Sequence, residues 1–147
     1  MRYNTATPYI AAFVLVGKDG KYAFVKRANT GWCDGYFGLP AGKVENGESF
    51  RQAAVREAKE EVGVDVQLTD LKFMVSAHRQ SEDSEWVDVI FEATSWSGEV
   101  INAEPEVHSE VAWFALTNLP ENTVPQLRPL LEAIVAGEQY VEVNWDK

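Results

Sequence analysis

The sequence predicts an α/β fold in which the strands of a mixed sheet lie between two helices. The first observation behind this prediction is that short strand-like runs and helix-like patterns follow one another along the chain. The second is the length of 147 residues with 46% apolar residues, which suits one core that buries roughly two-thirds of the unfolded surface. The third is that the sequence contains no repeat, low-complexity segment or linker. Residues 1–147 are therefore expected to form a single domain.

The chain opens with a hairpin pattern. Strand-like runs at 10–17 and 21–26 are joined by Lys18-Asp19-Gly20, which is typical of a tight turn. The first run is apolar, but it is short, follows a single basic residue and lacks a small-residue cleavage site, so we expect a strand and not a signal peptide. No run approaches the ~20 apolar residues of a transmembrane helix. A soluble cytoplasmic protein without a membrane partner is therefore expected.

The central segment carries helix signals at both ends. Ser49 followed by Gln52 forms a capping-box pattern that starts a helix, and Gly63 can end it in the left-handed conformation. Between them Val55 lies at the edge of an apolar stripe formed by Phe50, Ala54, Ala58 and Val62. The preceding segment 38–48 is rich in glycine and contains a proline, so it is expected to be a loop that enters the helix.

The rest of the chain adds strands and a second helix. Strands are predicted over 71–78, 86–96 and 111–116. The first two are expected to pair antiparallel around a flexible polar tip at 81–84. A helix is predicted over 125–136, with one apolar face made of Leu127, Leu130, Leu131 and Ile134. Residues 140–145 are expected to form a last strand or a packed tail.

The predicted central helix carries a cluster of carboxylates. Glu57, Glu60 and Glu61 are three and four residues apart, so they gather on one side of the helix, where like charges repel. A bound cation would offset this repulsion, and hard carboxylate oxygens suit Mg²⁺ or Mn²⁺. The alternative is an ordinary solvated helix in which the acids pair with Arg56 and its basic neighbours.

The net charge and the cysteine count exclude some binding partners and some kinds of site. The net charge of −10 argues against a nucleic acid polymer as partner, because binding a phosphate backbone needs a basic face. An acidic protein with a polyphosphate substrate needs local cations, which again indicates a bound metal. The single cysteine, Cys33, excludes an internal disulfide and a cysteine-based zinc site.

Residues 42–64 carry a motif by which a family becomes recognisable. The segment reads Gly-x5-Glu-x7-Arg-Glu-Ala-x-Glu-Glu-x-Gly-Val, from Gly42 to Val64, with every fixed position filled. It resembles the Nudix box. The resemblance implies a Nudix-type α/β/α sandwich with a mixed sheet and a loop–helix–loop catalytic motif. It also implies hydrolysis of a pyrophosphate bond in a nucleoside diphosphate linked to another group, with Mg²⁺, or Mn²⁺ in its place, as cofactor. Homodimers are common in this family, so the resemblance allows a homodimer here.

The resemblance assigns roles to residues inside the motif. Glu57, Glu60 and Glu61 would hold the metal ion. Glu57, or a carboxylate outside the box, would accept the proton of the attacking water, and Arg56 would orient Glu57. The expected catalytic residues are therefore Arg56, Glu57 and Glu60.

Residues outside the strict motif are expected to complete the site. Glu48 would support the loop or lie in an outer metal shell. The carbonyl of Ala41 would contact the metal, although relatives often have glycine where Ala41 stands. Glu104 lies in a loop resembling the one that supplies a further metal-binding acid in nucleoside triphosphate hydrolases of the family. The alternative for Glu104 is that it belongs to an ordinary solvated acidic loop and binds no metal. Many relatives have lysine shortly after this acid, whereas this chain has Val107 and His108.

Candidate substrate contacts come from residues near the motif. Arg27 and Lys43 are expected to contact phosphate or base, and Tyr36 or Phe37 is expected to stack on a base. One such stacked ring contributes ~1–3 kcal/mol. Aromatic residues at strand positions usually pack in the core, so that role is expected for Trp86, Trp96 and Trp113.

The substrate is inferred from what the sequence lacks. Family members that hydrolyse ADP-ribose tend to have a proline some distance after the box, and those that hydrolyse dinucleoside polyphosphates tend to have a tyrosine. Neither residue occurs over 65–104. The expected substrate is therefore a nucleoside triphosphate, converted to the monophosphate and pyrophosphate. The alternatives are another nucleoside diphosphate derivative such as a nucleotide sugar, a non-catalytic nucleotide sensor, or an acidic structural domain.

Overall fold

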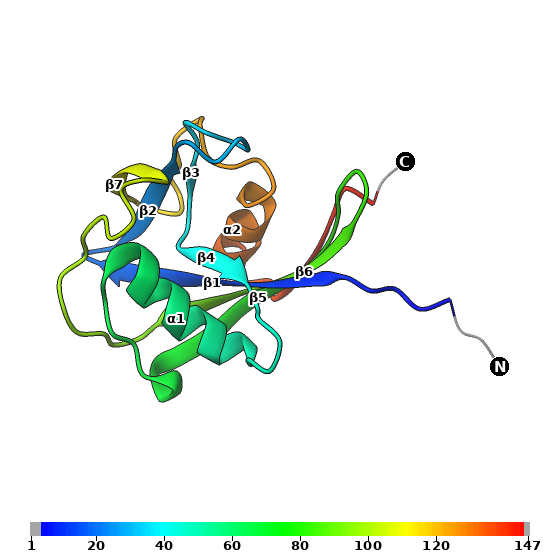
Figure 1. Cartoon of the computed structure of the whole chain (residues 1–147), viewed down its shortest axis with the longest axis horizontal. Helices are drawn as coiled ribbons and strands as arrows, with labels where there is room; N and C mark the ends of the chain where they lie inside the picture. Colours follow the sequence, from blue (N-terminus) through cyan, green and yellow to red (C-terminus); the bar gives the residue numbers. More distant parts are fainter. Residues whose placement is uncertain (1–3, 146–147) are drawn as a thin grey trace.

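The computed structural model describes residues 4–145 and is built on a mixed sheet (Figure 1). The main part of the sheet has the order β4–β1–β6–β5–β8, in which neighbours are alternately antiparallel and parallel. These strands are β1 (Tyr9–Lys18), β4 (Ala41–Lys43), β5 (Leu71–Gln80), β6 (Glu85–Ala93) and β8 (Tyr140–Val143). Strand β1 is therefore held on both sides, by β4 and by β6.

A smaller antiparallel group continues from the end of β1. It consists of β2 (Lys21–Arg27), β3 (Phe37–Gly38) and β7 (His108–Phe114), with β2 in the middle. Only Gly17 and Lys18 of β1 pair with β2. The turn between β1 and β2 has positive φ at Asp19 and Gly20, as a tight hairpin turn requires. The predicted hairpin is confirmed.

Two helices cover opposite faces of the main sheet. Successive residues of β1 alternate between the faces: Val14 and Val16 pack with helix α1 (Phe50–Val62), whereas Leu15 packs with helix α2 (Arg128–Val135). The same alternation divides the residues of β5 and β6 between two core clusters. The structure is the predicted α/β/α sandwich, and Figure 1 shows α1 and α2 on the two sides of β1.

Helix α1 has the ends that the sequence predicts. The Ser49 side chain accepts a hydrogen bond from the Gln52 amide, and the Gln52 side chain accepts one from the Ser49 amide, which completes the capping box. Gly63 follows the last turn in the left-handed conformation, with φ of 76°. The buried face is wider than predicted, because it includes Ala53 and two of the helix carboxylates.

Other boundaries differ from the prediction. The segment 38–48 is not all loop, because β4 forms there by pairing with β1. The strand predicted over 86–96 ends at Ala93, while β7 begins at His108, before the predicted 111–116. Helix α2 begins at Arg128 and has a proline in its first turn, and residues 140–143 form a true strand beside β5. A short 3₁₀ turn, η1 (Leu68–Asp70), was not predicted.

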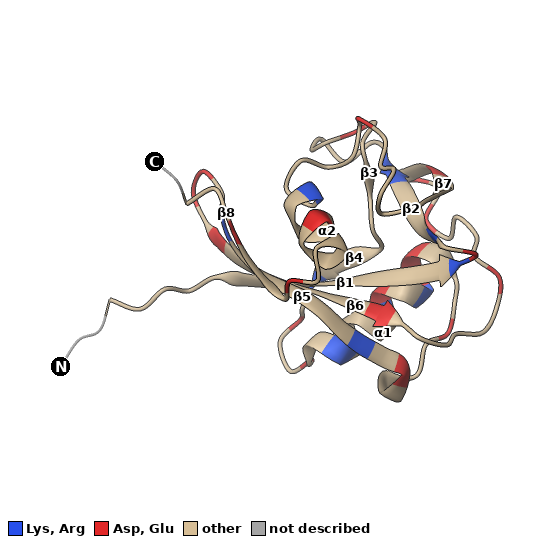
Figure 2. Ribbon diagram, turned by 180° about the vertical axis from the view of Figure 1, so that it is seen from behind, with Lys and Arg blue, Asp and Glu red and all other residues tan. Residues whose placement is uncertain are grey.

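Charged residues of both signs are interspersed along the chain. Figure 2 shows acidic segments on α1, on α2 and on the connecting loops, with basic segments between them. Within residues 4–145, no helix combines the length and the apolar character that crossing a membrane requires.

We predict that Ser49→Ala destabilises the protein by about 1 kcal/mol, because the first turn of α1 loses its side-chain acceptor. The unfolding midpoint should fall by about 2–4 °C for a chain of this size. Thermal or urea denaturation measures the effect. The matched control is Ser95→Ala in an exposed bend, which should change stability by less than about 0.5 kcal/mol. Equal effects of the two substitutions would contradict the capping role.

Candidate active site

Two carboxylates of α1 are buried where the helix meets β4. Glu57 is 8% exposed and Glu61 is 5% exposed. The amide of Ala41 donates a 3.0 Å hydrogen bond to Glu61 Oε2. A Cβ atom at Gly42 would collide with the Glu57 carboxylate, so glycine is required there by close approach and not by its backbone angles. The helix therefore meets this strand through polar contacts.

Arg56 connects the loop to the carboxylate cluster. Its Nε and Nη2 donate to the two oxygens of Glu48 at 2.8 and 2.9 Å, and its Nη1 donates to Glu57 Oε1 at 2.7 Å. Nη1 also lies 3.3 Å from Glu60 Oε2, and Nη2 donates to the carbonyl of Lys43 at 3.2 Å. Arg56 thus contacts Glu57, the residue on which its predicted orienting role would act. It also pairs with the exposed Glu60, as the alternative interpretation of the helix expects.

Glu48 supports the loop, as predicted. Hydrogen bonds from Arg56, and after them a backbone hydrogen bond from Glu45, lower the pKa of Glu48 to about 2. Glu48 is therefore charged at neutral pH. Together, Arg56 and Glu48 join the start of the loop–helix motif to the helix turn that carries Glu57.

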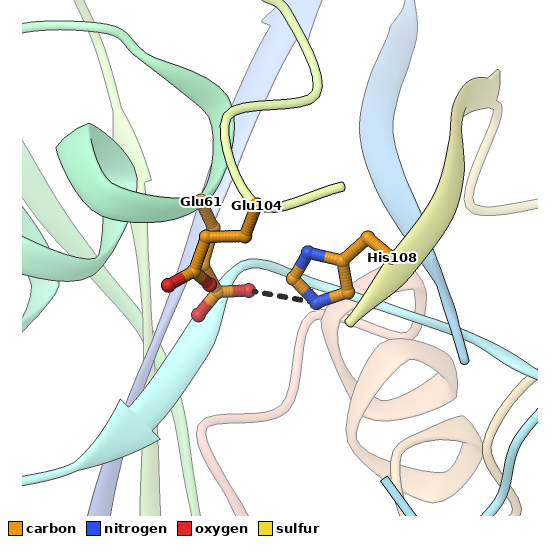
Figure 3. A group of neighbouring side chains, drawn as sticks. All are labelled: Glu61, Glu104 and His108. Carbon is orange, nitrogen blue, oxygen red and sulfur yellow. Dashed lines mark ion pairs between the residues drawn. The ribbon is translucent and has the colours of Figure 1, made fainter. Parts of the chain in front are cut away.

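A loop after β6 brings a third carboxylate to the cluster. The amides of Ile101 and Ala103 donate to the carbonyls of Val62 and Glu61 at 3.0 and 3.1 Å. These bonds satisfy carbonyls that the end of a helix otherwise leaves free. They also hold the loop against α1, so that Glu104 comes to lie beside Glu61 (Figure 3).

His108, the first residue of β7, completes a compact group with these two acids. One potential ligand atom from each of Glu61, Glu104 and His108 lies within 4.8 Å of the others. His108 Nε2 is 3.6 Å from Glu61 Oε1. Burial lowers the pKa of His108, and the charge of Arg27 lowers it as well. The imidazole is therefore favoured in its neutral form, and its contact with Glu61 is not an ion pair at neutral pH.

The cluster has the electrostatics of a cation site. Burial raises the pKa of Glu61, and the neighbouring Glu57 raises it further. Burial also raises the pKa of Glu104, followed by repulsion from Glu57 and Glu60. A divalent cation would reverse these shifts, and the donors are mostly carboxylate oxygens, which fit Mg²⁺ or Mn²⁺. The residues present thus fit the predicted metal.

A cleft of about 640 Å³ includes Glu61 and His108 of this cluster in its lining. That volume lies within the usual range for small-molecule sites. Its lining includes Ala41, Gly42, Glu61 and His108, and it also includes residues of β5, β6 and their connection: Arg79, Ser84, Trp86 and Asp88. Trp32 and Gln126 also line it. The cleft therefore joins the carboxylates to a more aromatic region.

The structure corrects part of the predicted substrate site. Phe37 is buried and packs edge-on against Phe114, so it is not available for stacking on a base. Tyr36 is exposed but is not among the residues that line the cleft. The aromatic residues that do line it are Trp86, which was predicted to be in the core, and Trp32. Trp32 is 48% exposed.

The predicted cationic contacts do reach the cleft. Arg27 and Lys43 both line it. The Arg27 guanidinium lies 4.9 Å from the Trp32 ring centroid and donates to the Trp32 carbonyl at 2.8 Å. Lys43 Nζ lies over the rings of Tyr9 and Trp86, at 4.5 and 5.5 Å. Positive charge therefore accompanies both tryptophans.

Sequence reasoning did not assign His108 or Asp88 to the site. The sequence marked His108 only as one of the residues present where many relatives have lysine. An isolated histidine does not by itself indicate a binding site. Asp88 is buried in β6 and accepts two hydrogen bonds from Arg79, at 2.7 and 3.2 Å. A single acid within an apolar strand gives no motif that could have revealed this pairing.

Comparison with known proteins identifies the family. The family model described as NUDIX domain matches residues 6–134. An ADP-ribose pyrophosphatase of Methanocaldococcus jannaschii is 32% identical over 114 residues, which are 78% of this chain and 66% of that protein. The NAD-capped RNA hydrolase NudC of Pseudomonas aeruginosa is 38% identical over 119 residues, which are 81% of this chain and 40% of that protein. The chain therefore belongs to the NUDIX domain family.

A solved structure agrees in fold. The crystal structure of a MutT NUDIX hydrolase from Burkholderia pseudomallei superposes with a TM-score of 0.76 at 29% identity. The match covers 86% of this chain and 97% of that one. The chain spans between about one third and two thirds of the length of the first curated relatives it matches.

We predict that Gly42→Ala destabilises the protein by about 1–3 kcal/mol, because the added methyl group must displace the buried Glu57 carboxylate. Urea denaturation in the presence of a chelator measures the effect without metal. Gly38→Ala is the matched control in the same cleft, since its Cβ would meet Val124 at an ordinary 3.6 Å. The control should shift stability by no more than about 1 kcal/mol. A Gly42 variant as stable as the control would contradict the close approach.

Proposed function

We propose that this chain is a metal-dependent pyrophosphohydrolase acting on a nucleoside diphosphate linked to another group. The observation that carries the proposal is the group formed by the buried Glu57 and Glu61 and the half-buried Glu104, because Glu61 lines a cleft of ligand size. Buried acids without enough positive charge are costly, so their placement suggests a ligand cation. Membership of the NUDIX domain family supports the same chemistry.

The proposed reaction is attack by water on a phosphorus atom of the pyrophosphate link. The new bond joins the water oxygen to phosphorus, the bridging P–O bond breaks, and the water proton passes to a carboxylate. A bound Mg²⁺ or Mn²⁺ neutralises phosphate charge and makes the water more acidic. Glu57, Glu60, Glu61 and Glu104 would hold the metal, together with the predicted carbonyl of Ala41.

Two carboxylates are candidates for accepting the proton. Glu57 Oε1 accepts a 2.7 Å hydrogen bond from Arg56, which fixes the direction of the carboxylate. Glu104 lies outside the box, and burial and nearby acids raise its pKa. Both carboxylates lie beside the proposed metal site, so either is placed to accept the proton.

For the substrate we propose a nucleoside triphosphate, cleaved to the monophosphate and pyrophosphate. Support comes from the tryptophans of the cleft, which offer stacking surfaces for a base, and from Arg27 and Lys43, which offer positive charge for phosphates. The lack of proline and tyrosine over 65–104 also favours it. The main alternatives are ADP-ribose, after the name of one relative, and a nucleotide sugar.

A non-catalytic sensor is less well supported. A protein that only binds nucleotides has no need to keep every acid of the motif, whereas this chain keeps Glu57, Glu60 and Glu61. The proposal extends to a cytoplasmic enzyme whose partner is a small nucleotide. A homodimer stays a prediction from the family resemblance.

We predict that a panel of nucleoside triphosphates, ADP-ribose and nucleotide sugars will show metal-dependent release of phosphate or pyrophosphate, fastest with a triphosphate. Glu57→Gln and Glu61→Gln should each lower kcat by about 10²-fold or more, because carboxylates that hold metal or move a proton are lost. Removing the metal with a chelator should abolish turnover.

The matched control for these variants is Glu110→Gln. Glu110 is exposed on β7 and pairs only loosely with Lys26 at 3.8 Å, so its loss should leave kcat unchanged. Unchanged activity in both the Glu57 and Glu61 variants would sink the catalytic assignment. Tight nucleotide binding without turnover of any substrate would favour the sensor.

Stacking in the cleft gives a separate prediction. Trp86→Ala and Trp32→Ala should each raise KM by about 5–100-fold, since a base–aromatic stack contributes about 1–3 kcal/mol. Steady-state kinetics on the best substrate measure this effect. Tyr36→Ala is the matched control, because Tyr36 is exposed but does not line the cleft. An effect confined to Tyr36 would show that the base binds elsewhere.

A further inference from the structure

His108 is a buried polar residue that the proposed reaction does not use. The side chain is 6% exposed, and its Nδ1 is buried without a hydrogen-bond partner among residues 4–145. Buried histidines normally satisfy both ring nitrogens, because an unpaired polar group costs free energy. The ring points toward the carboxylates of Glu61 and Glu104 (Figure 3). Nε2 is the nitrogen 3.6 Å from Glu61 Oε1, so it is the nitrogen placed to share a ligand with the carboxylates, while the unpartnered Nδ1 shows that no described residue fixes the ring through its other side.

The distances suit a shared cation better than a direct hydrogen bond. His108 Nε2 is 3.6 Å from Glu61 Oε1, beyond the usual range for an N–H···O bond. Two ligand atoms bound to one metal ion at about 2.1 Å lie about 3.0–3.6 Å apart, depending on the angle between them. The separation of Nε2 and Oε1 falls at the upper end of that range. One oxygen of Glu104 lies within 4.8 Å of a ring nitrogen of His108 and of a carboxylate oxygen of Glu61.

The backbone around His108 is fixed from several directions. Its amide donates to the Glu104 carbonyl at 2.9 Å, and its carbonyl accepts from Asn102 Nδ2 at 2.7 Å. Asn102 Oδ1 also accepts from the Glu104 amide at 3.2 Å. Pairing of His108 with Arg27 at a bulge of β2 adds a further restraint. One small network therefore positions both Glu104 and His108.

We propose that His108 Nε2 is a metal ligand beside Glu61 and Glu104, which makes this a mixed nitrogen–oxygen site for a divalent transition-metal ion such as Mn²⁺. The inference rests on the proposed metal site but not on the identity of the substrate. Imidazole nitrogen binds first-row transition metals well, whereas Mg²⁺ prefers oxygen ligands alone. His108 thus shifts the preference of the site away from Mg²⁺.

The direct test is pulsed electron paramagnetic resonance of Mn²⁺ bound to the full chain, without nucleotide. Nitrogen bound to Mn²⁺ modulates the electron spin echo, and labelling histidine with ¹⁵N changes that modulation. The chain has only two histidines. We expect a ¹⁴N signal that changes on histidine labelling, is absent in His108→Ala and persists in His78→Gln. His78 is the matched control because it pairs with Glu85 and does not line the cleft.

Affinity gives the second measurement. His108→Ala should weaken Mn²⁺ binding by about 10-fold or more, since even an outer-shell partner of a metal site is worth 10–100-fold. Mg²⁺ affinity, measured by calorimetry, should change by less than about 3-fold, because Mg²⁺ gains little from imidazole. The His78 variant should leave both affinities unchanged. Equal weakening of Mn²⁺ and Mg²⁺ by His108→Ala would indicate a structural role and overturn the inference.

The remaining outcomes separate this inference from the proposed function. Bound Mn²⁺ without nitrogen modulation in the wild type overturns the histidine ligand and leaves metal-dependent hydrolysis standing. Failure of the wild type to bind Mn²⁺ or Mg²⁺ overturns both. The wild-type spectrum with labelled histidine needs no variant, so the test stands even if His108→Ala does not fold.

Discussion

The structure depends on a polar contact between a helix and a strand. Helix α1 meets β4 through the buried carboxylates of Glu57 and Glu61, an arrangement that costs free energy unless every oxygen finds a partner. The Ala41 amide partners one oxygen of Glu61 and the Arg56 guanidinium partners one oxygen of Glu57, while the missing side chain at Gly42 leaves room for the Glu57 carboxylate. The contact explains why a glycine-rich segment becomes a strand, since β4 must run close to both α1 and β1.

The same helix organises the rest of the site through its C-terminal end. Carbonyls in its last turn accept hydrogen bonds from the loop that carries Glu104, and that loop leads directly into His108 and β7. The site is thus assembled from three chain segments that converge on one helix turn. Because β7 pairs with β2, the same connection brings Arg27 and the adjoining Trp32 to the cleft. Helix α1, the carboxylate group and the cleft are therefore connected through the same loop and strand contacts.

The sequence correctly predicted features that depend on neighbouring residues, and it failed for features that depend on contacts between distant segments. The ends of α1 were predicted from Ser49 and Gly63 because capping depends on residues within one turn. Strand β4 was missed because its pairing partner lies far away in the sequence. Trp86 was assigned to the core because it lies in a strand. Alternation along a strand predicts which face of the sheet a side chain is on, but it does not predict whether another segment covers that part of the face. Phe37 was assigned to the cleft for its sequence position and packs against Phe114 instead.

By itself, the sequence determined the strand–helix order, the capped helix and the spacing of its acids, because these follow from short-range sterics and hydrogen bonding. The motif of 42–64 also determined the family, since it carries enough fixed positions to be specific. Only the tertiary structure decided that Glu57 and Glu61 are buried while Glu60 is exposed, that Glu104 and His108 join them, and that tryptophans line the cleft. Burial and convergence depend on contacts between distant segments, and no local pattern encodes which of those segments will meet.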